Sequence, residues 1–131
     1  MKMMSSTPKK VLFVDDEPAL LALGEDLLTD EGYQVVCASD PRQALDLFAQ
    51  HEHQFDLVVT DESMPGMTGT ELAQQLFQLA PQLPVILCSG YLLTMADEGI
   101  GATNIKEVLA KTDVFFKLPS TIASLFAPNQ H

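Results

Sequence analysis

The chain has 131 residues, 47% of them hydrophobic, and a formal net charge of −11 at pH 7. This length and composition predict one globular domain with a substantial buried core. The negative charge argues against direct binding of nucleic acid, because phosphate backbones are recruited by Lys and Arg. No apolar run has transmembrane length, and residues 1–10 lack the apolar stretch of a secretory signal, so we expect a cytoplasmic protein with no membrane contact.

The first part of the chain predicts two strands, each followed by a helix. Lys10–Val14 (KVLFV) is an apolar run of strand length, and Pro18 suits the first turn of a helix after it. Gln34–Ala38 (QVVCA) predicts a second strand. Asp40 as N-cap and Pro41 at the first helical position then predict a second helix.

A third strand is predicted at Asp56–Thr60 (DLVVT), whose consecutive apolar residues are bounded by charge on both sides. Asp61 follows at its carboxyl end, and the turn residues Met64-Pro65-Gly66 come soon after. We therefore expect the strand to end by presenting Asp61 to solvent. In an open α/β sheet, ligands bind outside the carboxyl ends of the strands, so Asp61 is well placed for function. From this segment alone, a functional Asp61 and a solvated loop aspartate are equally consistent with the sequence.

The second part predicts a further helix and two more strands. Thr68 and Glu71 have the spacing of a capping box at a helix start. Pro84–Cys88 (PVILC) and Glu107–Ala110 (EVLA) predict the fourth and fifth strands. Two glycines within residues 92–105 predict that the helix there is short or frayed.

Alternating strands and helices predict an α/β fold, a three-layer sandwich. We expect a flavodoxin-like (βα)5 arrangement with parallel sheet order 2-1-3-4-5. The domain should span residues 9–127, with a disordered N-terminal tail at 1–8 and a C-terminal tail at 128–131. The last helix should begin near Pro119 or kink there, because proline removes a helical hydrogen bond.

Two cysteines, Cys37 and Cys88, lie in the second and fourth predicted strands. Unpaired cysteine behaves most often as a small buried hydrophobe. We expect both to be reduced thiols of the core.

Acidic side chains gather at the predicted carboxyl edge of the sheet. With strand order 2-1-3-4-5, Asp15, Asp16 and Asp61 all end at the topological switch point. Clustered carboxylates call for a cation, and their hard oxygens suit Mg²⁺. Ser89 and Lys111 add a hydroxyl and an ammonium at neighbouring strand ends. An aspartate nucleophile, a metal site, a hydroxyl and a fixed cation are the groups that phosphoryl transfer needs.

These features resemble the receiver domain of two-component response regulators. The resemblance rests on DD after the first strand, D-x-x-MPG after the third, a hydroxyl residue and Gly after the fourth and Lys after the fifth. The stretches TDESMPGMTGTELA and PVILCSGY are similar to receivers of hybrid sensor histidine kinases.

The resemblance implies a place in a phosphorelay. Asp61 matches the phosphoacceptor, which takes a phosphoryl group from a sensor histidine kinase or exchanges it with a histidine phosphotransfer protein. Asp16 and Asp61 match the direct Mg²⁺ ligands, with Asp15 acting mostly through water and the backbone carbonyl of Ser63 completing the set.

Signalling would follow from a change of shape. The resemblance implies that Ser89 and Lys111 bind the phosphoryl group and bias the surface of the fourth helix, fifth strand and fifth helix, where a downstream protein docks. This would be a signalling domain and not an enzyme, limited to self-phosphorylation from phosphodonors and autodephosphorylation. We expect a monomer or weak dimer.

Several positions near the site are expected to tune it. Thr112 stands where the family has a proline in a cis peptide, so we expect a trans bond after Lys111 and a rearranged loop, which leaves the direction of the Lys111 side chain open. Val108 replaces the family's aromatic switch. Ser63 and the bulky Tyr91 flank the site, and Tyr91 predicts slow self-dephosphorylation.

An apolar cluster near the end of the chain predicts a partner surface. Its members share a segment with little predicted helical order: Val114, Phe115, Phe116 and Leu118. Core packing explains about half of them, and the remainder predict a docking patch.

Two other functions stay open. A degenerate receiver acting as a phosphorylation-independent protein-binding module is favoured by Thr112 and Val108, whereas the intact acidic group, Ser89 and Lys111 argue against it. A Mg²⁺-dependent phosphohydrolase with an aspartyl nucleophile is less favoured. Such enzymes carry the nucleophile after the first strand in a D-x-D pattern, where this chain has DDEP.

Overall fold

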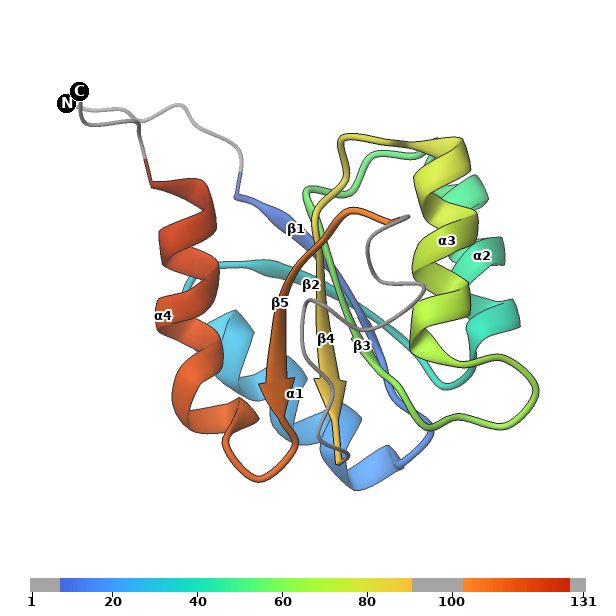
Figure 1. The fold of residues 1–131 in the computed structure, drawn as a ribbon. Helices are drawn as coiled ribbons and strands as arrows, with labels where there is room; N and C mark the ends of the chain where they lie inside the picture. Colours follow the sequence, from blue (N-terminus) through green and yellow to red (C-terminus); the bar gives the residue numbers. More distant parts are fainter. Residues whose placement is uncertain (1–7, 91–102, 128–131) are drawn as a thin grey trace, which may run out of the picture.

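The computed structural model describes residues 8–90 and 103–127. Its elements, in chain order, are β1 (Lys10–Val14), α1 (Pro18–Asp30), β2 (Gln34–Ala38), α2 (Pro41–Gln50), β3 (Leu57–Asp61), α3 (Gly69–Leu79), β4 (Val85–Ser89), β5 (Ile105–Ala110) and α4 (Val114–Phe126) (Figure 1). The strands form one parallel sheet in the order β2-β1-β3-β4-β5. The flavodoxin-like prediction is therefore confirmed. The helix and tails expected within residues 92–105, 1–8 and 128–131 fall almost wholly outside the described residues.

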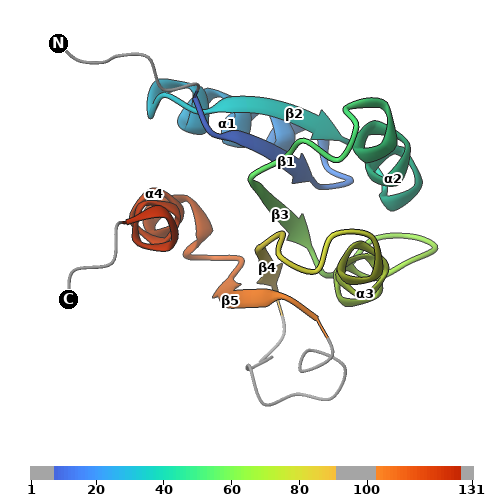
Figure 2. The ribbon, with the colours of Figure 1, turned by 90° about the horizontal axis from the view of Figure 1, so that it is seen from above.

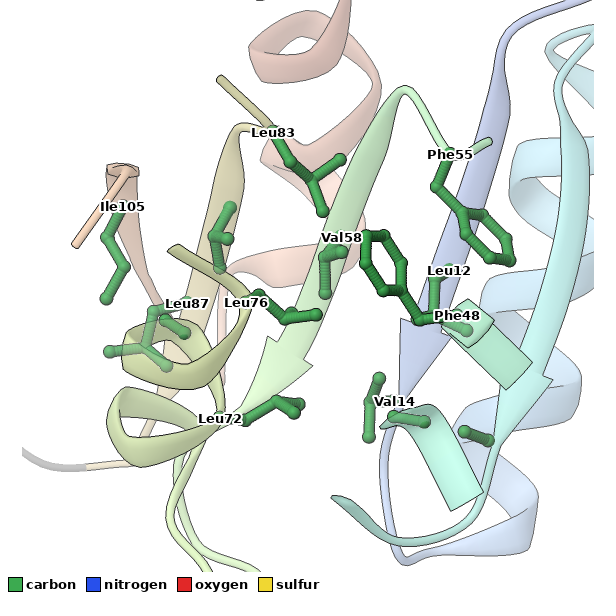
Figure 3. Packing of buried hydrophobic residues seen from close by; sticks show 14 of the residues in the cluster. Leu12, Val14, Phe48, Phe55, Val58, Leu72, Leu76, Leu83, Leu87 and Ile105 are labelled. Atoms are coloured by element: carbon green, nitrogen blue, oxygen red, sulfur yellow. The ribbon is translucent and has the colours of Figure 1, made fainter. Parts of the chain in front are cut away.

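Helices cover both faces of the sheet and make three layers (Figure 2). One apolar cluster joins the sheet to α2 and α3, with Phe48 and Leu76 among its buried members (Figure 3). A second cluster joins the opposite face to α1 and α4, through Leu28 and Ile122. The apolar residues of β1, β3 and β4 are thus buried from both sides, which explains why these strands are continuous apolar runs.

Local signals placed the helix starts correctly. The carboxylate of Asp40 accepts a hydrogen bond of 2.8 Å from the amide of Gln43 at the start of α2. Thr68 and Glu71 form the reciprocal capping box, with hydrogen bonds of 2.9 and 3.0 Å. These side chains satisfy amides that would otherwise lack a partner in the first helical turn.

The predicted bounds of three strands shift slightly. β3 begins at Leu57 and includes Asp61, and β4 runs through Ser89. β5 begins at Ile105, two residues before its predicted start. Asp56 lies just before β3, and its carboxylate accepts a 2.8 Å hydrogen bond from the amide of Lys10.

Both cysteines are unpaired, as expected. Cys88 is buried, and burial raises the pKa of its thiol to about 12. Cys37 is only half-buried, and its pKa is raised to about 11, again mainly by burial. The thiols therefore stay protonated and unreactive near neutral pH.

Of the two alternatives for the last helix, a start near Pro119 was wrong, and a kink at Pro119 stays a prediction. α4 begins at Val114, five residues before Pro119, and continues through it. Pro119 costs about 3 kcal/mol in a helix interior, whereas fully burying one large aliphatic side chain stabilises by about 1.5–3 kcal/mol. Val114, Leu118 and Ile122 lie four residues apart on one helical face, and all three are buried. Packing against the sheet therefore outweighs the local effect of the proline.

We predict that Gly24→Ala destabilises the domain by about 1–3 kcal/mol, as overpacking does. Gly24 lets α1 pack closely on β1, and a β-carbon there would lie 1.7 Å from Cε2 of Phe13. The measurement is the free energy of unfolding in urea. Gly90→Ala is the matched control, because its new β-carbon meets no atom of the described residues within 4 Å. Equal stability of wild type and Gly24→Ala would contradict the prediction.

We also predict opposite outcomes for two neighbours on α4. Leu118 is fully buried, so Leu118→Ala should cost about 2–5 kcal/mol of unfolding free energy. Phe116 is 87% exposed, so Phe116→Ala should change stability by no more than about 0.5 kcal/mol. Chemical denaturation of both variants checks this, and a large loss for Phe116→Ala would show that its ring belongs to the core.

Candidate functional site

Polar side chains converge at the carboxyl edge of the sheet. Asp15 follows β1, Asp61 and Ser89 end β3 and β4, and Lys111 follows β5. Because the strands are parallel and in register, these ends meet at one place. Carboxylate oxygens of Asp15, Asp16 and Asp61 all lie within 4.8 Å of one another. The predicted acidic group therefore forms.

Asp61 is buried, so the expectation that the strand presents it to solvent was wrong. Only 2% of the residue is exposed. β3 extends through Asp61, and the start of α3 packs against it so closely that a β-carbon on Gly69 would lie 2.3 Å from its carbonyl oxygen. The side chain of Lys111 lies over its carboxylate. Asp61 thus lies within the edge of the core.

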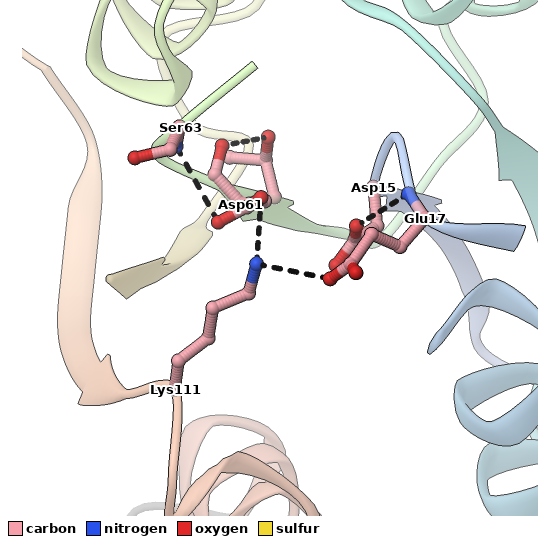
Figure 4. A network of polar contacts seen from close by, with 6 residues as sticks. Asp15, Glu17, Asp61, Ser63 and Lys111 are labelled. Carbon is pink, nitrogen blue, oxygen red and sulfur yellow. Dashed lines mark hydrogen bonds and ion pairs between the residues drawn. The ribbon is translucent and has the colours of Figure 1, made fainter. Parts of the chain in front are cut away.

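Lys111 is the cation of the site. Its Nζ donates to Oδ2 of Asp61 at 3.0 Å and lies 3.7 Å from Oε1 of Glu17 (Figure 4). Partial burial lowers the pKa of Lys111, but the hydrogen bond and charge of Asp61 raise it by more, and the net shift is upward. Lys111 therefore stays charged at neutral pH.

The trans peptide expected after Lys111 is confirmed, since no described peptide bond is cis. The side chain of Lys111 points into the site, toward Asp61. Its amide donates to the carbonyl of Ser89 at 2.8 Å, which holds the backbone after β5 against β4. This bond keeps the side chain aimed at Asp61 even though Thr112 replaces the expected proline.

The surroundings of Asp15 disfavour its charged form. Asp15 is 5% exposed, and burial raises its pKa. The amide of Glu17 donates to Oδ1 at 2.9 Å and lowers the pKa in part. The negative charge of Asp61 raises the pKa further. Asp16 is exposed beside it. Buried and exposed carboxylates at this spacing suit a hard divalent cation that keeps part of its water.

The remaining predicted site residues lie around this centre. Ser89 is buried at the end of β4. Ser63 and Thr112 are exposed, and the Ser63 amide donates to Oδ1 of Asp61 over 3.4 Å. Val108 is half-buried and packs against the apolar cluster between the sheet and helices α2 and α3. Tyr91 lies outside the described residues.

The predicted partner cluster divides as expected between core and surface. Val114 and Leu118 are buried in the core, and Phe115 packs against it half-buried. Phe116 alone among the four is strongly exposed. Any docking role of this cluster therefore rests on the two phenylalanines.

Two contributors were not recognised from the sequence. Glu17 was seen only as the third acid after β1, yet it is the second partner of Lys111. Glu62 accepts hydrogen bonds of 2.8 Å from the amide and the hydroxyl of Thr70, so it ties the residue after Asp61 to the start of α3. Charge beside a motif residue was the available signal for both.

None of the helices in the described ranges is long and apolar enough to cross a membrane.

Comparison with known proteins identifies a family. The sequence model of the response regulator receiver domain matches residues 11–117. The chain is 40% identical over 80 residues to two-component response regulator ARR14 of Arabidopsis thaliana, covering 61% of this chain and 21% of that protein. It is 36% identical over 88 residues to transcriptional regulatory protein GlrR of Escherichia coli strain K12, covering 67% and 19%. The chain thus matches about a fifth of the length of these relatives.

Solved structures agree with this assignment. The response regulator TrrA of Thermotoga maritima, in complex with Mg²⁺ and beryllium fluoride, is 30% identical with a TM-score of 0.79, over 90% of this chain and 99% of that one. A structure of histidine kinase ThkA in complex with TrrA gives 30% identity and a TM-score of 0.79, over 91% and 99%.

We predict that Asp15→Asn stabilises the domain at neutral pH in buffer without divalent cations. The folded state raises the pKa of Asp15 above its ordinary 3.8, so it binds this proton more tightly than the unfolded chain does. Stability is therefore lost as pH rises from 3.8 through the folded pKa. Asparagine keeps the bond from the Glu17 amide and removes this loss. Thermal melts from about pH 4 to about pH 7 check it.

Asp26→Asn is the matched control, because it removes the same charge from an exposed position of α1. A melting temperature of Asp15→Asn at or below that of wild type at neutral pH would contradict the prediction, as would an equal gain in the control.

Proposed function

Because this chain belongs to the response regulator receiver domain family of two-component signalling, we propose that Asp61 accepts a phosphoryl group from a histidine kinase or a histidine phosphotransfer protein. The observation that carries this proposal is the buried Asp61 carboxylate, held by Lys111 at 3.0 Å beside two further aspartates. The histidine kinase bound to the similar TrrA supports a partner of that class.

Transfer would form one bond and break one. A carboxylate oxygen of Asp61 bonds to phosphorus as the N–P bond of the phosphohistidine breaks, and the bonding electron pair stays on the imidazole nitrogen. Lys111 can balance the charge that accumulates on the phosphoryl oxygens, because it is already positioned at Asp61. Because Asp61 is buried, its acyl phosphate would have little contact with water, which would also limit hydrolysis.

The acidic group fits the Mg²⁺ that receiver domains bind. Its carboxylates supply hard oxygen donors within 4.8 Å of one another, and the similar TrrA was solved with Mg²⁺. Asp16 and Asp61 would ligate the ion directly, with Asp15 through water and Ser63 through its backbone carbonyl. When bound, Mg²⁺ supplies positive charge that neutralises the phosphoryl oxygens.

The phosphoryl group would signal by re-pairing nearby groups. It adds negative charge and strong acceptors at Asp61, which draw in the Ser89 hydroxyl and the Lys111 ammonium. Lys111 would then loosen its contact with Glu17. We propose that β5 and α4 carry the change to a downstream protein, with exposed Phe116 as a contact. Because Val108 stands in place of the family's aromatic switch, the response would not include rotation of a ring on β5.

The remaining expectations form part of the same proposal. The receiver domain would span residues 9–127 and act in the cytoplasm as a monomer or weak dimer. Its own chemistry would be limited to self-phosphorylation and autodephosphorylation, with Ser63, Thr112 and Tyr91 tuning the lifetime of the phosphoryl group.

We predict that wild type, incubated with Mg²⁺ and acetyl phosphate, gains a mass of about 80 Da, the mass of one phosphoryl group. Asp61→Asn should gain none, because an amide oxygen is a poor nucleophile and leaves no acyl phosphate. Intact-protein mass spectrometry measures both, and omitting Mg²⁺ should suppress the adduct.

An adduct of equal size on Asp61→Asn would overturn the assignment of the acceptor. If neither protein gains mass, beryllium fluoride in place of acetyl phosphate tests the site without a donor. No change in the amide NMR spectrum on its addition would favour the phosphorylation-independent binding module.

A further inference from the structure

A cavity of about 220 Å³ lies directly beneath the acidic group, between the sheet and the starts of α1 and α4. Its apolar wall is formed by Phe13, Leu20, Cys88, Val114 and Phe115. These side chains come from both helices and from the strand face that they cover. The cavity therefore extends the site away from the strand ends, into the α1 and α4 layer.

The size of this cavity suits a small organic molecule. A cavity of roughly 150 Å³ with apolar walls is enough to hold benzene. This one is larger, so a six-membered ring with a short side chain fits its volume. The wall offers aromatic and aliphatic contacts, which an apolar ring or a branched alkyl group matches.

The other end of the cavity is negatively charged. The carboxylates of Asp15, Glu17 and Asp61 line it together with one ammonium, that of Lys111. Lys111 contacts Asp61 and Glu17. Asp15 is only 5% exposed, yet no ion pair within the described ranges involves it. A positive group on a ligand would gain from this excess of negative charge, and in the absence of a divalent cation an anion would be repelled.

We propose that this cavity binds a small primary amine with an aromatic or branched aliphatic body, whose ammonium lies between the carboxylates of Asp15 and Glu17. The body packs on Phe13 and Leu20. Both requirements are specific: the charged end selects a cation, and the apolar wall adds contacts that a bare inorganic ion cannot make. Neither the acidic group alone nor the apolar wall alone would define this ligand.

Binding of such an amine would regulate the site. The ammonium and a divalent cation would compete for the charge of Asp15 and Asp61, so the two would exclude each other. This consequence rests on the proposed function, because exclusion of Mg²⁺ would block phosphorylation of Asp61. Binding itself does not depend on phosphorylation.

The test is an amide NMR titration of the full chain with benzylamine, in buffer that contains EDTA and no phosphodonor. Benzyl alcohol and benzoate are the neutral and anionic comparators of similar shape. We expect saturable shifts at Leu20, Cys88 and Val114, and apparent dissociation constants at least about tenfold weaker for both comparators. Excess Mg²⁺ should weaken the binding of benzylamine.

Two variants locate the ligand. Glu17→Gln should weaken the binding of benzylamine roughly twofold to fivefold, as loss of one exposed charge contact does. Glu25→Gln, which removes the same charge from an exposed position of α1 outside the cavity, should leave binding unchanged. Leu20→Phe should weaken binding by filling the apolar end, and the amide spectrum reports whether that variant is folded.

The proposal would be overturned by equal binding of benzoate, by shifts confined to another part of the domain, or by no saturable binding of benzylamine. It would also fail if Glu17→Gln and Glu25→Gln had equal effects. Because no phosphodonor is present, these results are separate from the outcome of the mass measurement on Asp61.

Discussion

Burial of the central strands on both faces is the constraint on which the rest of the structure depends. β1, β3 and β4 lie between two layers of helices, so their side chains must be apolar or internally bonded. Thr60, a buried polar residue within β3, meets this rule by donating to the carbonyl of Asp61 at 3.0 Å. In these three strands, charged side chains occur only at the strand ends. Parallel pairing brings the carboxyl ends to one edge of the sheet. The same constraint thus builds the core and collects the site.

Collecting carboxylates at that edge creates an imbalance of charge. Asp15 and Asp61 are both buried, whereas Lys111 forms ion pairs with Asp61 and Glu17 and with no other described residue. Burial holds the pKa of Asp15 above its ordinary value. Such a site favours any cation that can enter it. Mg²⁺ is the form expected for a receiver domain, and the apolar cavity below extends the same attraction to an organic ammonium.

α4 shows how tertiary packing overrides a local signal. Pro119 removes a hydrogen bond from the helix, yet the helix begins before it, because Val114 and Leu118 are buried on the sheet. That early start also brings Phe115 to the wall of the cavity and leaves Phe116 in solvent. The start of α4 at Val114 therefore determines both the wall of the cavity beside Asp61 and the surface available to a partner.

The sequence by itself determined the order of strands and helices, the capping of α2 and α3, and the identity of the acidic group, because periodicity, caps and strand-end charges are local properties. From these the fold and most of the site followed. Only the tertiary structure decided that Asp61 is buried, that Lys111 reaches it despite Thr112, and that Glu17 joins them. These outcomes depend on the directions and distances of side chains from segments far apart in the chain, which the packing of strands and helices sets and no local pattern specifies.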